Sequence, residues 1–298
     1  MKSMQKLHVN KLRKLMILNN DWEQQAVALD STGTLSKRDI GKMLGVPKST
    51  VSDMLRKYYG SLAVTNGPEV NVVDNSINAR ILVISDLHFP YEHPKTFEFL
   101  QSLKDKYNFT RVVQLGDEVD HHASSFHDSD PDLYSSGHEL KKAQEKIKRL
   151  EAMFPEMDLL DSNHGSLVYR KAKHHGIPAH CIKSYNEMLG VSDKWRWHND
   201  LMLTLPNSQK VYFCHGRSSD GLKLSKNMSC NVIQGHFHSK FNVSYWSNPE
   251  NLYWSMQAGC LVDNNSLAMA YNKLTLDRPI LGCGVIINGV PHLEAMSL

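Results

Sequence analysis

From residue 80 onward, short apolar segments alternate with polar turns that contain glycine. Seven such segments stand out, at residues 80–85, 111–115, 157–161, 210–214, 231–234, 252–258 and 280–287. A short segment that is apolar at almost every position is typical of a strand that is buried on both faces. Burial on both faces in turn implies helices on the outside of layered sheets.

The polar stretches between these segments contain helical patterns, and the clearest of them covers residues 138–154. Its apolar residues recur at three- and four-residue spacing and form one stripe, which consists of Leu140, Ala143, Ile147, Leu150 and Phe154. Such a stripe lets a helix pack on the face of a sheet. The pattern over residues 80–298 therefore predicts a domain of the α/β class.

The first 60 residues are predicted to form a separate, all-helical domain. Helices are expected over residues 22–29, 36–44 and 47–59. Ser36 suits an N-cap, with Asp39 three residues further on, and Pro47 suits a first helical turn. Residues 61–79 are rich in Gly, Asn, Ser and Pro and lack a helical period, so we expect a linker with one short strand at residues 70–73.

The composition is that of a soluble globular protein, with 41% hydrophobic and 22% charged residues. No apolar run approaches the roughly 18 residues of a membrane span, so no membrane partner is predicted. The N-terminus has no small-residue cleavage site and does not resemble a signal peptide. Five cysteines without a CxxC pair indicate neither a disulfide framework nor a zinc knuckle. We therefore expect a cytoplasmic protein of a bacterial cell, with a phage gene as an open alternative.

The net charge of +3 conceals an uneven distribution. Residues 1–60 carry 11 Lys and Arg against 5 Asp and Glu, a balance of +6. The remaining residues carry 23 against 26, a balance of −3. A basic head on a mildly acidic body favours a polyanionic partner for the head, although a solvated helical surface would have the same composition.

Polar side chains follow five of the predicted strands, at the point where each strand ends. They are Asp86 and His88, Asp117 and Asp120, Asn163 and His164, His215, and His236 and His238. Ligand sites in open α/β sheets gather at the carboxyl ends of the strands. One such cluster would be ordinary turn chemistry, but five in this order predict a single site.

Carboxylate, imidazole and amide groups together suit borderline divalent metals, and the lack of thiolates argues against a structural zinc site. Seven candidate ligands are too many for one ion and suit two. We expect Mn²⁺, with Fe²⁺, Zn²⁺ or Ni²⁺ as alternatives. Two such ions clamp a phosphoryl group and turn a bridging water into a hydroxide nucleophile, which predicts hydrolysis of a phosphoester.

The segment NVIQGHFHSK places His236 and His238 one residue apart at the end of a predicted strand. Residues two apart on an extended chain point the same way, about 6.6–6.8 Å apart. Such a pair can straddle two ions that share a carboxylate, and Gly235 would let the backbone come close to them.

The series D-x-H, GD-x-x-D, NH, H and GH-x-H resembles the calcineurin-like metallophosphoesterase superfamily over residues 80 to about 290. The resemblance implies a two-sheet sandwich flanked by helices, with a dinuclear metal site at the strand ends. It implies one ion held by Asp86, His88 and His238, and a second held by Asn163, His215 and His236. Asp117 would bridge the ions. His164 would protonate the leaving oxygen or stabilise the charge that develops there.

Two motifs depart from those of other superfamily members. In the Ser/Thr protein phosphatases an arginine stands where this chain has His121, which weakens a protein-phosphatase reading. The repair nucleases usually have GNHD, whereas Ser162 and Gly165 flank the Asn–His pair here. Whatever orients His164 must therefore come from elsewhere. Asp120 is the candidate for this supporting role, with a plain turn cap as the alternative. The motifs GDEVDHHA and SNHG also resemble phage-type members.

A cationic stretch follows the predicted catalytic histidine and includes Arg170, Lys171 and Lys173. One interpretation is a wall that binds phosphates of a polyanionic substrate. The alternative is a solvated helix face, with Trp195 and Trp197 as core residues.

The segment LSKRDIGKMLGVPKSTVSDMLRKYY resembles a helix-turn-helix, over about residues 20–60. Gly41 would lie where two helices touch, and Gly45 would lie at the turn. The second helix would present side chains suited to phosphate and base-edge contacts, namely Lys48, Ser49, Thr50, Ser52, Arg56 and Lys57. DNA is the expected partner, and protein docking or dimerisation is the alternative.

The sequence thus predicts a metal-dependent hydrolase of phosphodiesters, a nuclease held on DNA by its helix-turn-helix. One alternative is a phosphomonoesterase acting on a nucleotide, a nucleic-acid end or a phosphoprotein. A second alternative is an inactive DNA-binding regulator, which the presence of every expected ligand type disfavours. The oligomeric state stays open.

Overall fold

The computed structural model describes residues 22–30, 35–60, 70–73, 78–125, 132–268 and 277–297. The chain divides into two compact units, residues 1–63 and residues 64–298. The predicted linker is described only at residues 70–73, where the expected short strand is present, and at residues 78 and 79.

The smaller unit contains three described helices, α2 (Trp22–Asp30), α3 (Lys37–Leu44) and α4 (Lys48–Gly60). They enclose a small apolar core of Ala26, Leu29, Ile40, Val51, Met54 and Leu55. Ser36 caps α3 as predicted, because its hydroxyl accepts from the Asp39 backbone N–H at 3.3 Å. A Cβ on Gly41 would lie 2.5 Å from the Val46 carbonyl oxygen, so only glycine permits this close approach.

The larger unit contains two mixed six-stranded sheets. In order, the first sheet consists of β1 (Val70–Val73), β6 (Leu201–Thr204), β7 (Lys210–Cys214), β8 (Asn231–Gln234), β10 (Leu252–Ala258) and β9 (Phe241–Ser247). The second consists of β12 (Val290–Ala295), β11 (Gly282–Ile287), β2 (Arg80–Ile84), β3 (Arg111–Gln114), β4 (Met157–Leu160) and β5 (Trp195–His198). The predicted fold class, α/β with two sheets and flanking helices, is confirmed.

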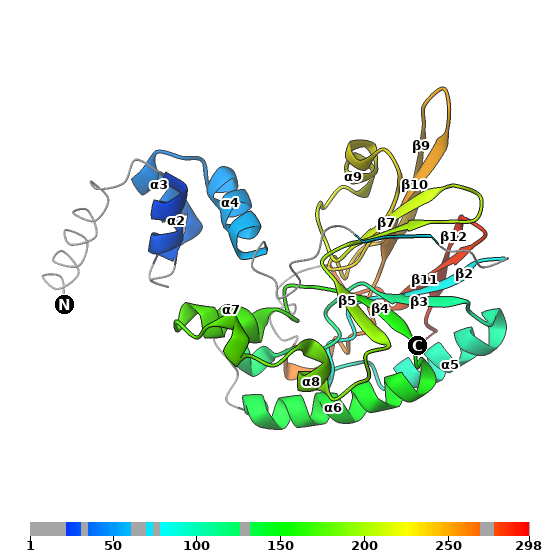
Figure 1. Ribbon diagram of the computed structural model, residues 1–298, viewed down its shortest axis with the longest axis horizontal. Coiled ribbons are helices and arrows are strands. Elements are labelled where there is room, and N and C mark those ends of the chain that lie inside the picture. Colours follow the sequence, from blue (N-terminus) through cyan, green and yellow to red (C-terminus); the bar gives the residue numbers. More distant parts are fainter. Residues whose placement is uncertain are drawn as a thin grey trace, which may run out of the picture. The chain divides into compact units, whose positions relative to one another are not determined.

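Helices cover the outside of both sheets (Figure 1). The longer ones are α5 (Thr96–Tyr107) and α6 (Ser136–Met153), which lie along the second sheet. The shorter ones are α7 (Leu167–His174), α8 (Tyr185–Leu189) and α9 (Gly221–Met228), with the 3₁₀ turns η1 (His122–Ser124) and η2 (Ala179–Cys181). None of the helices in the described ranges is long and apolar enough to cross a membrane.

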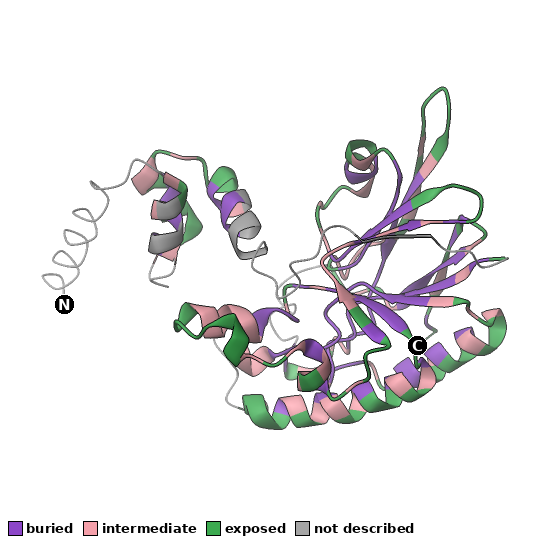
Figure 2. Ribbon diagram, in the orientation of Figure 1, coloured by how far each residue is buried: buried purple, intermediate pink, exposed green. Residues whose placement is uncertain are grey.

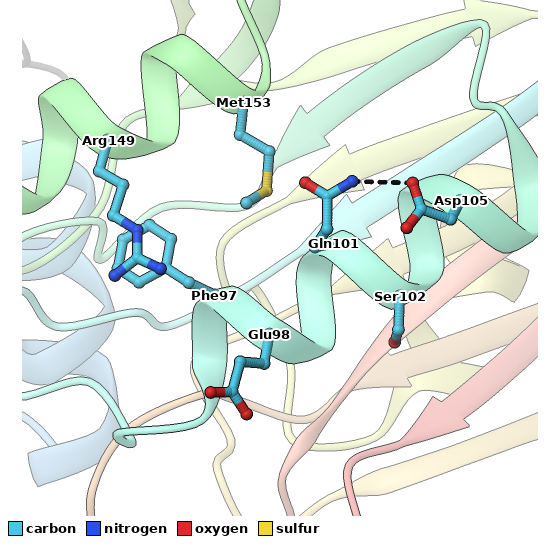
Figure 3. Close-up of a pocket in the computed structure, with 7 residues that line it drawn as sticks. All are labelled: Phe97, Glu98, Gln101, Ser102, Asp105, Arg149 and Met153. Carbon is cyan, nitrogen blue, oxygen red and sulfur yellow. Dashed lines mark hydrogen bonds between the residues drawn. The ribbon is translucent and has the colours of Figure 1, made fainter.

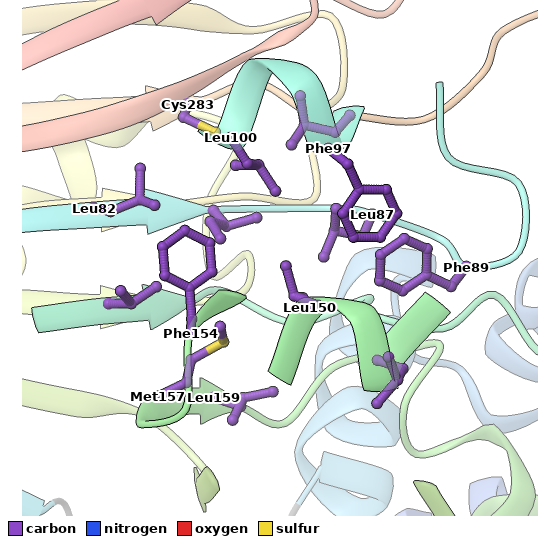
Figure 4. Packing of buried hydrophobic residues seen from close by; sticks show 14 of the residues in the cluster. Leu82, Leu87, Phe89, Phe97, Leu100, Leu150, Phe154, Met157, Leu159 and Cys283 are labelled. Carbon is purple, nitrogen blue, oxygen red and sulfur yellow. The ribbon is translucent and has the colours of Figure 1, made fainter. Parts of the chain in front are cut away.

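Strand β2 shows how the apolar strands serve two cores at once. Ile81 and Val83 pack in a cluster with residues of the first sheet, whereas Leu82 and Ile84 pack with residues of α5 and α6. Figure 4 shows part of the cluster that contains Leu82, in which Phe97 and Leu100 from α5 face Leu150 from α6. Successive residues of a strand point to opposite faces. The continuous apolar pattern therefore reflects burial on both faces, as predicted.

Helix α6 carries the predicted apolar stripe. Ala143, Ile147 and Leu150 are buried, and so is Phe154 directly after the helix, while Leu140 packs partly buried against the same core. Figure 2 shows buried and exposed positions alternating along α6, as expected for a helix with one face on a sheet.

All seven strands predicted after residue 80 are present within one or two residues of their expected ends, in addition to the short strand predicted at residues 70–73. Four further strands were not predicted, namely β5, β6, β9 and β12. Three of these four are sheet edges, since β9, β12 and β5 each have a partner on one side only. An edge strand need not be apolar throughout, and β12 even contains Pro291.

A pocket of about 440 Å³ lies between α5 and α6 (Figure 3). Gln101 donates to Asp105 across one turn of α5 at 2.8 Å, and the Arg149 guanidinium lies 4.0 Å from the centre of the Phe97 ring. No predicted site residue lines this pocket, so it is not the predicted site.

Asp158 on β4 links three strands of the second sheet. Its carboxylate accepts from Arg111 on β3 at 2.6 Å and from Arg196 on β5 at 3.0 Å. His198 on β5 is a third partner, with its Nε2 at 2.9 Å. Burial alone would raise the pKa of Asp158, but the hydrogen bonds with His198 and Arg196 outweigh burial and lower the pKa.

We predict that Asp158→Asn lowers the free energy of unfolding at pH 7 by about 1–3 kcal/mol, because buried charged hydrogen bonds are lost. A carboxyl whose pKa falls on folding stabilises the protein above its unfolded pKa of about 4, and this stabilisation is lost as the pH falls toward the folded value. The difference between wild type and variant should therefore shrink in urea unfolding at pH 3. Asp105→Asn, on an exposed face of α5, is the control. An equal difference at both pH values would contradict the prediction.

Candidate metal centre

The polar residues that follow the strands come together at the carboxyl ends of five strands. Strands β2, β3 and β4 are parallel neighbours in the second sheet, and β7 and β8 are parallel neighbours in the first. Their carboxyl ends therefore lie at one edge of each sheet. Hydrogen bonds connect the two edges. His236 and His238 follow β8 in the first sheet, and both bond to Asp86, which follows β2 in the second sheet.

The backbone at this place is in an unusual conformation. Asp86, His88, Asp117 and His236 have φ angles of 50°, 49°, 54° and 69°. Non-glycine residues rarely adopt the left-handed region, and such conformations gather at functional sites. Two backbone hydrogen bonds hold the first turn, from Asp86 to Gly116 at 3.2 Å and from His88 to Asp117 at 2.9 Å. These four residues therefore keep a strained backbone conformation, which directs their side chains toward the site.

The expectation that His236 and His238 share an extended chain was wrong. Strand β8 ends at Gln234, His236 lies at a bend with its positive φ, and His238 lies in a turn. Gly235 does approach the neighbouring motif, since a Cβ there would lie 1.9 Å from Ser85 Oγ and 2.6 Å from Asp86 Oδ2. The bend, not strand geometry, separates the two imidazoles.

Asp86, His88 and His238 form one group of converging ligand atoms. His238 Nε2 lies 3.1 Å from Asp86 Oδ1 and 3.2 Å from His88 Nε2. The other nitrogen of His88, Nδ1, lies 2.6 Å from Asp120 Oδ1. A carboxylate can only accept, so Nδ1 carries a proton, and Nε2 is the nitrogen that faces the group.

Asp117, His215 and His236 form a second group, and Asn163 lies beside it. His215 Nε2 is 3.1 Å from Asp117 Oδ2 and 2.7 Å from Asn163 Oδ1. His215 Nδ1 donates to the carbonyl oxygen of Leu115 at 2.9 Å, so Nε2 is the nitrogen that faces Asp117 and Asn163. The His215 and His236 rings are 5.0 Å apart.

Asp117 lies between the two groups. Its Oδ2 is 3.1 Å from His215 Nε2 and 3.6 Å from His88 Nε2. Its Oδ1 accepts from the backbone N–H of His164 at 3.0 Å. This is the position that a carboxylate shared by two ions would occupy.

The pKa shifts of His215 and Asp86 show how charge is balanced in the two groups. Burial alone would lower the pKa of His215, but the charge of Asp117 outweighs burial and raises the pKa to about 9. Burial alone would likewise raise the pKa of Asp86, but hydrogen bonds with His238 and His88 lower the pKa well below its ordinary value. Each group therefore stabilises added positive charge.

The donor set fits divalent cations. In each group, carboxylate oxygens and imidazole nitrogens converge, with their ligand atoms all within 4.8 Å of one another. A divalent cation among them would compensate the buried carboxylate charge and could take the place of protons on the imidazoles. Nitrogen and oxygen donors without thiolate suit Mn²⁺, Fe²⁺ or Zn²⁺.

His164 lies at the rim of the site and is partly exposed. Its Nδ1 donates to the backbone carbonyl of Asp120 at 2.5 Å and lies 3.3 Å from that residue's Oδ1. No hydrogen bond from the described part of the chain reaches its Nε2. Asp120 therefore orients two residues: its side chain holds His88, and its carbonyl holds His164.

The cationic stretch lies on α7, next to the Asn163 loop. Arg170 donates to the backbone carbonyl of Asn163 at 2.5 Å, so part of its guanidinium supports that loop. Lys171 and Lys173 are half-buried on the same helix, and the contact of these residues with a substrate stays a prediction. Trp195 is a core residue, as the alternative interpretation expected.

The predicted DNA-contacting residues lie on α4. Lys48, Ser49 and Thr50 are exposed in its first turn, and Ser52 is half-buried. The side chains of Arg56 and Lys57 lie outside the described part of the structure.

Sequence reasoning missed the role of Ser162 and the burial of Glu118. The Ser162 hydroxyl accepts from the backbone N–H groups of Asp117 at 2.9 Å and Gly165 at 3.0 Å, so it joins the loops after β3 and β4. Burial raises the pKa of Glu118 to about 7. A serine in a polar turn gives no signal of a tertiary contact, and neither does a glutamate next to a predicted ligand.

No protein-family model matches the sequence, and no curated protein matches it. Among solved structures, the chain is similar to vacuolar protein sorting 29 from Cryptosporidium parvum. The identity is 12%, the alignment covers 74% of this chain and 98% of that one, and the TM-score is 0.39. It is also similar to Vps29 from Chaetomium thermophilum, with 11% identity, coverage of 75% and 97%, and a TM-score of 0.35. At these TM-scores the likenesses carry no argument about function, which rests on the site.

We predict that Gly235→Ala disrupts the site while the fold remains. The new methyl group would displace Ser85 and Asp86, so the affinity for Mn²⁺ should fall by about 10-fold or more. Equilibrium dialysis measures the bound Mn²⁺, and circular dichroism checks the fold. Gly137→Ala in α6 is the matched control, because a Cβ at Gly137 meets nothing within 4 Å. Full Mn²⁺ affinity in the Gly235 variant would disprove the proposed closeness of the two loops.

Proposed function

We propose that this chain is a phosphoesterase that depends on two divalent metal ions and belongs to the calcineurin-like metallophosphoesterases. One observation carries the proposal: two groups of carboxylate and imidazole ligand atoms converge on either side of Asp117. The series of motifs in the sequence supports the same function. Two ions bound there would polarise phosphoryl oxygens and lower the pKa of water to supply a nucleophile.

The chain's own residues hold and shape this site. Asp86, His88 and His238 would hold one ion, and Asn163, His215 and His236 the other, with Asp117 shared between them. Asp120 and the Leu115 carbonyl fix the tautomers of His88 and His215, and supporting contacts of this kind tune metal affinity.

His164 is suited to act on the leaving group. Its Nδ1 is held by Asp120, and its Nε2 has no partner among the described residues, so Nε2 is available to donate a proton to a leaving oxygen. Its backbone N–H is bound to Asp117, which places the imidazole beside the shared carboxylate. A general acid in this position helps most when the leaving group is a strong base.

The substrate that we propose is a phosphodiester of DNA. The basic head and the exposed Lys48, Ser49 and Thr50 on α4 support DNA as the partner. A head that holds DNA would raise the concentration of phosphodiesters at the metal centre.

A substrate panel tests the proposal. Protein treated with chelator and then with Mn²⁺ is assayed on the p-nitrophenyl ester of thymidine 5′-phosphate, p-nitrophenyl phosphate, single- and double-stranded DNA, and RNA. Hydrolysis should require Mn²⁺ and include the diester. If only the monoester is cleaved, the diesterase and nuclease reading is wrong, and no metal-dependent turnover on any substrate would remove the enzyme proposal. Lys48→Glu should weaken the action on long DNA and leave the thymidine ester unaffected.

The two histidines of the GHFH segment should serve different ions. We predict that the wild-type protein binds about two Mn²⁺ per chain and that His236→Ala and His238→Ala each weaken a different one. Calorimetric titration measures the two affinities, and the double variant should lose both. His180→Ala, at an exposed position in η2, is the control. Loss of the same ion in both single variants would contradict the assignment.

His164→Asn should lower kcat by about 10²–10⁴-fold on a thymidine dinucleotide, whose leaving alkoxide is a strong base, and much less on the p-nitrophenyl ester. Both Mn²⁺ ions should stay bound, because His164 is not assigned as a ligand. The measurement is kcat on both substrates together with metal content. An equal loss on both substrates would mean that His164 does not act as the acid.

A further inference from the structure

The residue between the two histidines, Phe237, is a partly exposed aromatic residue at the rim of the metal centre. It belongs to none of the hydrophobic clusters found among the described residues. Its ring contacts the His236 ring, with the ring centres 5.0 Å apart, and the Lys240 ammonium, 5.0 Å from the ring centre. A partly exposed aromatic ring offers apolar surface whose burial by a ligand is favourable.

The turn that carries Phe237 is fixed in place. The Phe237 N–H donates to the Gly235 carbonyl at 2.8 Å, and the Lys240 N–H donates to the Phe237 carbonyl at 2.8 Å. Lys240 Nζ donates to the carbonyl oxygen of Ser219, which ties this turn to the loop after His215. The backbone that carries the ring is thus held in place, and a fixed backbone loses little conformational entropy when a ligand stacks on the ring.

Lys240 places a positive charge over one face of the ring, which leaves the opposite face for a stacked base. An ammonium has three N–H donors, and the Ser219 carbonyl takes one of them. The other donors can bind a phosphate oxygen next to a base that stacks on Phe237. Proteins that bind single-stranded nucleic acid combine these two features, an aromatic ring for the base and a cation for the backbone.

We propose that Phe237 and Lys240 hold the nucleotide adjacent to the scissile phosphate, with the base stacked on Phe237 and a flanking phosphate on Lys240. This inference rests on the proposed phosphodiesterase function and specifies its substrate class. Phe237 lies between two ligand residues, so a base stacked on it belongs to a nucleotide next to the reacting group. A base can reach this ring only where the strand is unpaired, which favours single-stranded over double-stranded substrate.

The alternative role for Phe237 is to position His236 through the edge contact between their rings. The two roles differ in what they do to small substrates. Loss of stacking affects only substrates that carry a base, whereas displacement of His236 affects every phosphodiester.

Two diesters with the same leaving group separate these roles: the p-nitrophenyl ester of thymidine 5′-phosphate, which carries a base, and methyl p-nitrophenyl phosphate, which does not. Phe237→Leu keeps an apolar side chain on the turn and removes the aromatic face, and Phe237→Tyr keeps that face. In Phe237→Leu the ratio of kcat/KM for the thymidine ester to kcat/KM for the methyl ester should fall by about 10-fold, mainly through KM. The tyrosine variant should retain the wild-type ratio, and so should Tyr245→Ala, which removes a ring 53% exposed on β9.

The outcomes are distinct. An unchanged ratio in Phe237→Leu, or an equal loss on both esters, overturns the stacking role while the phosphodiesterase function stands. If the wild-type protein with Mn²⁺ cleaves neither ester nor DNA, the proposed function fails and this inference fails with it. Preference of the wild type for double-stranded over single-stranded DNA would also contradict the stacked base.

Discussion

The carboxylate of Asp117 is the contact on which the rest of the site depends. One of its oxygens faces imidazoles that follow strands of both sheets, and the other accepts the backbone N–H of the histidine proposed as the acid. Its own N–H is held by Ser162 from the next loop. A single buried charge therefore connects the loops after β2, β3, β4 and β7. Placing it there is costly unless positive charge compensates, and the neighbouring imidazoles supply only part of that compensation.

The backbone supports the same interpretation. Four of the seven predicted ligands have positive φ angles, a conformation that costs about 1–3 kcal/mol per residue and gathers at functional sites. Glycines let the loops approach closely enough for this arrangement, most clearly at Gly235. The strain and the buried carboxylates of Asp86 and Asp117 are both unfavourable, and bound cations would compensate the carboxylate charge. This is why a metal centre accounts for the site better than a network of hydrogen bonds does.

One residue near the site positions two functional side chains. Asp120 fixes His88 through its carboxylate and His164 through its carbonyl, so one residue positions both a proposed ligand and the proposed acid. The turn after β8 likewise combines two proposed roles. It carries the proposed metal ligands His236 and His238 together with the proposed substrate contacts Phe237 and Lys240.

The sequence by itself determined the α/β class, seven of the strands and the set of polar residues at the strand ends. These depend on local periods of apolar residues and on side-chain chemistry, which neighbouring residues carry. Only the tertiary structure decided how the polar residues pair. It placed a bend at His236 where an extended chain was expected, gave Asp120 two partners and made Ser162 a link between loops. The edge strands β5, β9 and β12 likewise became visible only with their partners. Contacts between loops that are far apart in the chain depend on how the sheets stack, and no local pattern encodes that geometry.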